Sequence, residues 1–166
     1  MKAFCIVATL FAACSGIQGV RAFEPIISIG GEHPLIHPDG TTDEILATQE
    51  QTDGLLGIIT IASDEEGFGP GPAIVHGSRA EFWYVLEGTY EFHVGDQTVE
   101  GGPGTFIGVD AGQPHGFVAK SPGKLLVTYM PGGYEHFFME WDRQDLKRGP
   151  ELGPLEESFG VTRPAP

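Results

Sequence analysis

Two histidines and one glutamate have the chemistry and the spacing of a small metal site. His76 lies five residues before Glu81, which begins the apolar run EFWYVL, and His115 follows a tight turn at residues 110–114. A carboxylate buried at the start of such a run is costly unless something compensates its charge. Two imidazoles and one carboxylate can bind a divalent cation and leave coordination positions open. The sequence therefore predicts a metal site at His76, Glu81 and His115.

The same residues also allow a site without metal. Arg79 lies two residues before Glu81, so in an extended strand both side chains share one face and could form an ion pair. His115 could be a turn residue whose imidazole bonds a backbone carbonyl. Both alternatives remain open at this point.

The other four histidines are assigned to less specific roles. His93 alternates with apolar residues in YEFHV and shares its face with Glu91, which predicts an outward position; it is a reserve fourth ligand only if the strand register is reversed. His33 and His37 lie in the Pro-rich segment GGEHPLIHPDG and are interpreted as surface or rim residues. His136 is expected to be exposed on a helix.

Short β-like runs must position these groups. The 166-residue chain contains 25 glycines and 13 prolines, which separate runs of alternating apolar residues. Regular short strands without intervening helices are typical of a sandwich or a small barrel. The predicted strands are Ile26–Ile29, Glu44–Thr48, Leu55–Ser63, Phe82–Leu86, Thr89–Val94, Gln97–Glu100, Thr105–Val109, His115–Ala119 and Leu125–Met130.

After Met130 the pattern changes from strand to helix. An aromatic stripe at helical spacing precedes a stop signal at Gly149-Pro150. This stripe is expected to pack as an outer helix on the barrel rather than to form a ligand platform. A second short helix is predicted at Pro154–Phe159. The aromatic stripe consists of Tyr134, Phe137, Phe138 and Trp141.

The first 22 residues have the pattern of a secretory signal peptide. Lys2 precedes an apolar run at residues 3–13, and Val20-Arg21-Ala22 has small residues where a signal peptidase cleaves. The run is too short to span a bilayer, and so is every later apolar stretch. A buried N-terminal strand is the alternative. We therefore expect a secreted protein with one mature domain at residues 23–166.

Composition restricts the site chemistry and the partners. Cys5 and Cys14 both lie in the predicted signal, so a metal site in the mature chain must use His, Asp or Glu. Loss of Lys2 and Arg21 would leave 7 basic and 23 acidic residues, a net charge of −16. Nucleic acid and anionic membranes are poor partners for such a surface. We interpret the acidity as an adaptation for solubility outside the cell.

Two motifs resemble those of small single-domain cupins of the quercetin-dioxygenase-like, type-2 branch. The first cupin motif has a glycine, two histidines one residue apart, a glutamate and a later glycine; here it spans Gly71 to Gly88 and includes His76 and Glu81. The second, glycine- and proline-containing motif ends in a histidine and here runs from Gly104 to His115. The resemblance extends from about residue 55 into the aromatic helix. It implies an all-β jelly-roll barrel, with a core at about residues 55–130 and a C-terminal helical extension at 131–160.

The resemblance also implies a ligand set. Carried over position by position, it makes His76, Glu81 and His115 metal ligands and places Ile74 where the first motif histidine stands. Three ligands would suit iron as a two-histidine, one-carboxylate triad, with zinc, manganese or nickel as alternatives. Asp110 stands at the usual proline position and Ala119 at the usual asparagine. The pocket wall is expected to contain Ile74, Trp83, Val85, Phe106 and Phe117.

The function implied by the resemblance is a metal-dependent oxidoreductase of the dioxygenase type, acting on a small molecule of aromatic or polyketide type in natural-product metabolism. Glu81 would serve as a ligand or, if it swings free, as a catalytic base. One alternative is a metal-dependent isomerase, cyclase or lyase. Another is a degenerate member that binds a small ligand without catalysis, which Ile74 favours. A homodimer is expected, with the outer positions Phe82, Tyr84 and Leu86 and the terminal aromatic helix as its contact surfaces.

Overall fold

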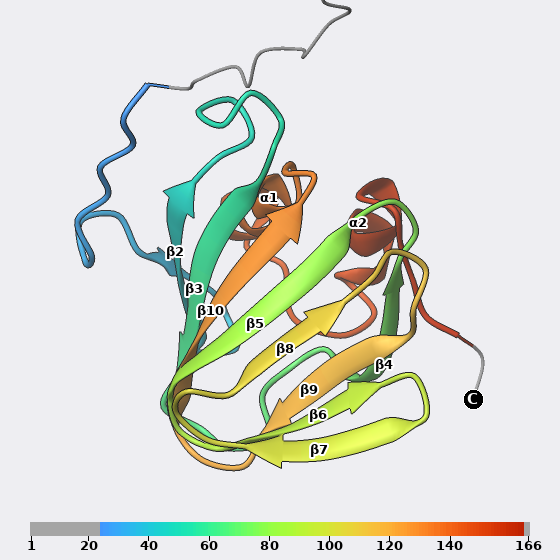
Figure 1. Cartoon of the computed structure of the whole chain (residues 1–166). Coiled ribbons are helices and arrows are strands. Elements are labelled where there is room, and N and C mark those ends of the chain that lie inside the picture. The colour runs from blue at the N-terminus through green and yellow to red at the C-terminus, as the bar shows by residue number, and fades with distance from the viewer. Residues whose placement is uncertain (1–23, 165–166) are drawn as a thin grey trace, which may run out of the picture.

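A computed structural model describes residues 24–164, which form two antiparallel β-sheets and two short helices (Figure 1). The predicted signal peptide at residues 1–22 lies outside the described residues. The elements are β1 (Leu35–Ile36), β2 (Thr42–Ala47), β3 (Gly57–Ser63), β4 (Gly71–His76), β5 (Ala80–Glu87), β6 (Tyr90–Val94), β7 (Gln97–Gly101), β8 (Phe106–Val109), β9 (His115–Ala119), β10 (Gly123–Met130), α1 (Glu135–Gln144), α2 (Gly153–Ser158) and β11 (Val161–Thr162).

The larger sheet has the strand order β1-β2-β3-β10-β5-β8. Its central strand β10 pairs with β3 on one side and with β5 on the other, so the two longest apolar runs flank it. Inward residues alternate with outward ones, as period-two sequences dictate. The inward positions Ile59, Trp83, Val85, Leu125 and Val127 are fully buried.

The smaller sheet has the order β11-β4-β9-β6-β7 and faces the larger one across a shared core (Figure 1). Tyr90, Phe92 and Phe117 on its inner face pack against Trp83 and one another. The predicted all-β, two-sheet jelly-roll architecture with a C-terminal helix is therefore confirmed. The strand at β4 was missed because Gly and Pro crowd the preceding residues 67–72.

The C-terminal helices form as predicted, and the aromatic stripe packs inward, as expected for a helix on the barrel. Phe137, Phe138 and Trp141 are buried, and α1 contacts β1 and β3. Figure 1 shows α1 beside the ends of β3 and β10, and α2 near the ends of β4 and β5. Within residues 24–164, neither helix is long and apolar enough to cross a membrane. The expectation that the stripe packs on the barrel and forms no ligand surface needs correction, because these aromatic side chains also line a cavity.

Several local expectations differ from the structure. Residues 26–29 do not form a strand. His37, expected at the surface or rim, is buried, because its loop folds under α1 and its ring stacks on Trp141 with centroids 3.8 Å apart. His93 faces outward with Glu91, as predicted, with 3.0 Å between His93 Nε2 and Glu91 Oε1.

An apolar surface lies on the outer side of the larger sheet. Tyr84 and Leu86 are exposed there as expected, together with Phe106 and Met130. Phe82 stacks on Phe106 with ring centroids 6.1 Å apart. The homodimer expected on this surface stays a prediction.

Candidate metal centre

Three strand termini bring the predicted ligands together. His76 is the last residue of β4, His115 is the first residue of β9, and Glu81 is the second residue of β5. The pairing of Ile74 with His115 aligns β4 and β9 in the smaller sheet, and the backbone N–H of Gly112 donates to the His76 carbonyl at 2.8 Å. Glu81 reaches the histidines from the larger sheet. The cluster thus joins the two sheets at one end of the core.

One carboxylate oxygen lies close to both imidazoles. Glu81 Oε2 is 3.0 Å from His76 Nε2 and 3.1 Å from His115 Nε2. The other oxygen, Oε1, accepts a 2.6 Å hydrogen bond from Trp83 Nε1. All three residues of the cluster are at least 96% buried. The indole therefore fixes the carboxylate so that only Oε2 is directed at the histidines.

The hydrogen bonding of His115 prepares its other nitrogen for a cation. His115 Nδ1 lies 2.7 Å from the carbonyl oxygen of Gln113, which can only accept, so Nδ1 carries the proton. In the neutral ring, Nε2 then directs a lone pair at Glu81 Oε2. A proton or a cation between the two atoms removes this repulsion. An imidazole held by a backbone carbonyl in this way is the usual arrangement of a metal-bound histidine.

His76 leaves polar atoms without partners in the protein. Its Nε2 is close to Glu81 Oε2, yet neither ring nitrogen makes a hydrogen bond of favourable geometry with any described residue. Its ring instead contacts Tyr134, with centroids 4.4 Å apart. Buried polar atoms in proteins are nearly always satisfied, so an orphaned imidazole beside a carboxylate indicates a missing partner.

The charge state of the cluster follows from its contacts. Burial on its own would raise the pKa of Glu81, but the hydrogen bond with His115 and the adjacent His76 lower the pKa to about 2. Burial lowers the pKa of His115, and its contact with Glu81 outweighs this effect and raises the pKa. Glu81 is therefore an ionised carboxylate at neutral pH.

Arg79 does not neutralise Glu81. Its guanidinium Nη2 donates to the Phe159 carbonyl at 3.5 Å, and the group lies over the Tyr134 ring, 5.2 Å from the centroid. The alternative of an Arg79–Glu81 pair, which the sequence left open, is thus not what the structure shows. The turn interpretation of His115 is correct for Nδ1 and leaves Nε2 available.

The separations fit a single bound ion. Two donor atoms each about 2.1 Å from one cation and at right angles lie about 3.0 Å apart. This matches the distances of 3.0 and 3.1 Å from Glu81 Oε2 to His76 and His115. The ligand atoms of all three residues lie within 4.8 Å of one another. A metal of the two-histidine, one-carboxylate class fits these residues, and the geometry leaves its identity open.

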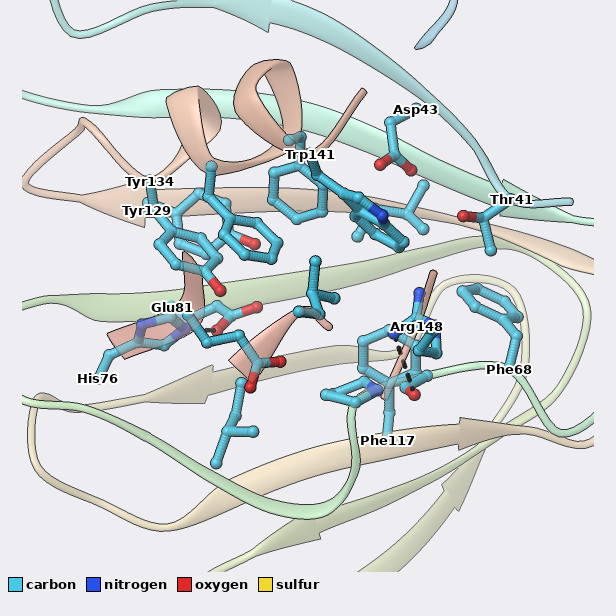
Figure 2. A pocket seen from close by; sticks show the side chains of 18 residues that line it. Thr41, Asp43, Phe68, His76, Glu81, Phe117, Tyr129, Tyr134, Trp141 and Arg148 are labelled. Atoms are coloured by element: carbon cyan, nitrogen blue, oxygen red, sulfur yellow. Dashed lines mark hydrogen bonds and ion pairs between the residues drawn. The ribbon is translucent and has the colours of Figure 1, made fainter. Parts of the chain in front are cut away.

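A cavity extends from this cluster towards the C-terminal segment (Figure 2). The empty space among its side chains amounts to about 540 Å³, a figure that includes space open to solvent. His76 and Glu81 lie at one end, and Asp43 and Arg148 lie at the other. Its walls are mainly aromatic. The lining includes Phe68, Phe117, Tyr129, Tyr134, Phe137, Phe138 and Trp141.

The expected pocket wall needs correction. Ile74 and Phe117 line the cavity, whereas Trp83 and Val85 are fully buried behind it. Phe106 is 62% exposed on the outer face of β8. Alternate residues of a strand face opposite sides, and here it is Val109 that is buried, so the inward face was assigned one residue out of register.

Sequence reasoning missed two tyrosines beside the cluster. Tyr129 pairs directly with Glu81 across β10 and β5, and Tyr134 precedes α1. Burial, together with the nearby Glu81 charge, raises the pKa of both phenols well above the usual value. Both therefore stay protonated at neutral pH. A signal was available for Tyr129, because it falls on the inward face of a predicted strand.

A second set of acidic and histidine side chains, Glu50, Glu135 and His136, lies elsewhere. The buried Glu135 carboxylate accepts backbone hydrogen bonds from Gln49 at 2.6 Å and Gly133 at 2.7 Å. Glu50 is exposed, and its Oε2 lies 3.2 Å from His136 Nε2. Glu135 thus serves to join two loops, and this set is not the candidate site.

Comparison with known proteins finds a domain model that matches these residues. Residues 61–133 match Cupin_2, the cupin domain, a range that contains the whole His76–Glu81–His115 cluster. No curated protein sequence matches significantly.

Solved structures show the same fold at low sequence identity. An RmlC-like cupin from Shewanella frigidimarina superposes with a TM-score of 0.58 at 18% identity, over 69% of this chain and 97% of that one. KdgF from Halomonas sp. gives 0.54 at 20% identity, over 65% and 94% of the two chains. A predicted oxalate decarboxylase from Thermotoga maritima gives 0.50 at 18% identity, over 55% and 80%. At these identities the likeness shows the fold alone.

Proposed function

The chain contains a cupin domain, and we propose that it is a metal-dependent, dioxygenase-like oxidoreductase that acts on a small aromatic molecule. The observation that supports this proposal most directly is the buried His76–Glu81–His115 cluster at the end of an aromatic cavity. Two histidines and one carboxylate on one side of an ion form the ligand set of many iron oxygenases. Iron is therefore the favoured metal, ahead of zinc, manganese or nickel.

The protein residues have distinct roles in this proposal. His76, Glu81 and His115 would hold the metal, which when bound would supply Lewis-acid and redox chemistry. Glu81 is assigned as a ligand rather than a base, because a carboxylate with a pKa of about 2 accepts protons poorly at neutral pH. The Trp83 hydrogen bond also restrains it from swinging free.

The cavity wall would bind and orient the substrate. Phe117 and Trp141 offer apolar surface on opposite parts of the cavity, which suits a flat molecule and excludes water from the reacting end. The phenols of Tyr129 and Tyr134 lie beside His76, with ring centroids 5.9 and 4.4 Å from its ring. They can donate hydrogen bonds to a developing oxyanion of the substrate.

A second candidate, a metal-dependent isomerase or cyclase, is favoured by the same tyrosines. Both phenols remain protonated at neutral pH, so either could deliver a proton to a substrate carbon or oxygen without any oxidation. Oxygen consumption separates the two candidates. Turnover of a phenolic or polyketide-type substrate with oxygen uptake supports the first, and turnover without uptake supports the second.

Both candidate functions require a metal bound at the cluster. Elemental analysis of protein purified without added metal or chelator tests this requirement. We expect a stoichiometric divalent metal in the wild type and its loss in His115→Ala. His93→Ala is the matched control, because His93 is a partly buried strand histidine that pairs with Glu91 away from the cluster. Equal metal content in His115→Ala and wild type would reject the site, and the protein would then be a ligand-binding module.

A further inference from the structure

A second buried polar pair lies in the wall of the cavity, away from the metal centre. His37 Nε2 is 2.7 Å from Asp43 Oδ2, and both side chains are at most 1% exposed. His37 lies under α1, where its ring stacks on Trp141. Asp43 lies on β2 and lines the cavity. One carboxylate oxygen is therefore fixed from behind by the histidine.

The other oxygen of Asp43 has no partner. Oδ1 is buried, and no described residue donates a hydrogen bond to it. Figure 2 shows the Asp43 carboxylate on the far side of the cavity from His76 and Glu81. A buried acceptor left unsatisfied destabilises the fold, and more so when it is charged. Structural reasons alone do not explain an acid placed there.

The neighbouring donors are already engaged. The Thr41 hydroxyl donates to Asp39 Oδ1 at 2.7 Å. The guanidinium of Arg148 pairs with Asp39 Oδ2, lies over Trp141 and reaches the Gly69 carbonyl at 3.4 Å. Asp43 Oδ1 is thus left to accept a hydrogen bond from a molecule that enters the cavity.

The sheet register sets the distance between the two polar ends. Asp43 aligns with Ile61, Leu125 and then Val85 across three strand spacings, and Val85 is four residues from Glu81 along β5. On a flat sheet these steps would separate the two Cα atoms by about 20 Å. The inward side chains of Asp43 and Glu81 shorten this span, and a ligand that contacts both ends must still be elongated, so a two-carbon acid is too short.

We propose that Asp43 determines substrate specificity by accepting a hydrogen bond from a hydroxyl or amine group at the end of the substrate distant from the metal centre. The ligand class is then an elongated aromatic molecule with an oxygen at one end and a hydrogen-bond donor at the other. Only the assignment of the oxygen-bearing end of the ligand rests on the proposed function. The donor end depends on Asp43 and on its support by His37.

The test uses two probes that differ by one hydroxyl, 4,4′-dihydroxybiphenyl and 4-hydroxybiphenyl, with binding measured by calorimetry. Wild type should bind the diol roughly tenfold or more tightly, because a hydrogen bond to a charged group contributes about 1.5–3 kcal/mol. Asp43→Ala should bring this ratio close to one. Asp43→Asn, which preserves size, should give an intermediate ratio, because it replaces the charged acceptor by a neutral amide.

Two further proteins complete the experiment. Glu44→Gln is the matched control, since Glu44 is the next residue of β2 and its carboxylate binds Lys124 and Thr60 instead of facing the cavity; it should keep the wild-type ratio. His115→Ala, which should lose metal, should still bind 4-hydroxybiphenyl, because the single hydroxyl of this probe can then turn to Asp43; binding retained without metal separates a failure of the metal centre from a failure of this inference. Equal affinities in wild type, an unchanged ratio in Asp43→Ala, or no binding of either probe at millimolar concentration would each overturn the inference.

Discussion

Trp83 Nε1 donates a 2.6 Å hydrogen bond to Glu81 Oε1, and both side chains lie on the inner face of β5. Because the residues are two positions apart in a strand, the indole and the carboxylate lie next to each other on the same face. This hydrogen bond engages one carboxylate oxygen of Glu81 and directs the other oxygen at His76 and His115. Trp83 thus positions the carboxylate of the candidate metal centre, although it does not line the cavity.

Trp83→Phe should lower metal affinity and leave most of the fold intact. Loss of an outer hydrogen bond to a ligating side chain typically weakens metal binding by about 10–100-fold. Competition with a chromophoric chelator would measure the change. Trp141→Phe is the control, because Trp141 Nε1 donates to the Leu146 carbonyl at 2.7 Å, away from the cluster. Equal losses of affinity in the two variants would contradict a positioning role for Trp83.

The metal-free protein should lose stability in acid through Glu81. Its pKa falls from 4.5 to about 2 in the folded state. A carboxyl group with a depressed folded pKa stabilises the fold above its unfolded pKa, and this stabilisation disappears as the pH falls from about 4.5 to 2. Over that range, chelator-treated wild type should lose on the order of 3 kcal/mol more unfolding free energy than Glu81→Gln. Urea unfolding at a series of pH values measures it.

His115 should produce the opposite dependence at higher pH. The pKa of His115 is raised in the folded state, so its contribution to the free energy of unfolding is complete below about pH 6.5. This contribution is lost as the pH rises through the pKa of the folded state. The Glu81→Gln variant should lack both effects, because the same carboxylate causes the two shifts. If that variant lost as much stability in acid as wild type, other carboxyl groups would be the cause of the acid sensitivity.

The sequence predicted the His76–Glu81–His115 cluster because strand periodicity and turn residues place it. His76 and His115 each lie next to a recognisable turn, and the parity of β5 puts Glu81 and Trp83 on one face. The two-sheet fold followed from the spacing of the Gly and Pro turns. These features are local, so they can be recognised without knowing the tertiary structure.

The far end of the cavity could not be predicted in the same way. Asp43, His37 and Trp141 come together only because the segment before β2 passes beneath α1. The stripe of α1 was correctly read as buried, but amphipathic periodicity does not tell whether a helix covers a core or a cavity. Phe106 was misplaced because an error of one residue in a strand reverses its face.

The His37–Asp43 pair should be important for stability. His37→Phe retains a ring against Trp141 but leaves a buried carboxylate unpaired, which typically costs about 3–5 kcal/mol. Burial already raises the pKa of Asp43, so the loss should shrink in acid, where the carboxyl group becomes neutral. Thermal unfolding at neutral and acidic pH measures both effects. His93→Phe, at a partly exposed pair, should change stability little; similar losses at the two positions would contradict the argument.

Secretion remains a prediction of the N-terminal sequence. The Lys2 start, the apolar run at residues 3–13 and Val20-Arg21-Ala22 predict removal of residues 1–22. Edman sequencing of the exported protein should therefore begin at Phe23. An Ala22→Phe substitution should block cleavage by placing a bulky residue at the peptidase site. Export of a chain that retains Met1 would refute the cleavage.

Ile74→His should strengthen metal binding. Ile74 lines the cavity beside the cluster, and it pairs with His115 across β4 and β9. An imidazole at this position is two residues before His76 on the same face of β4, so it can reach an ion held by the other three ligands. The extra ligand should raise affinity, while the buried polar ring should destabilise the metal-free protein by about 1–3 kcal/mol. Chelator competition and unfolding with and without metal would show both changes.

The control is Ile74→Phe, which fills the site without a ligand atom. A similar rise in metal affinity in this variant would mean that packing, and not coordination, limits metal binding.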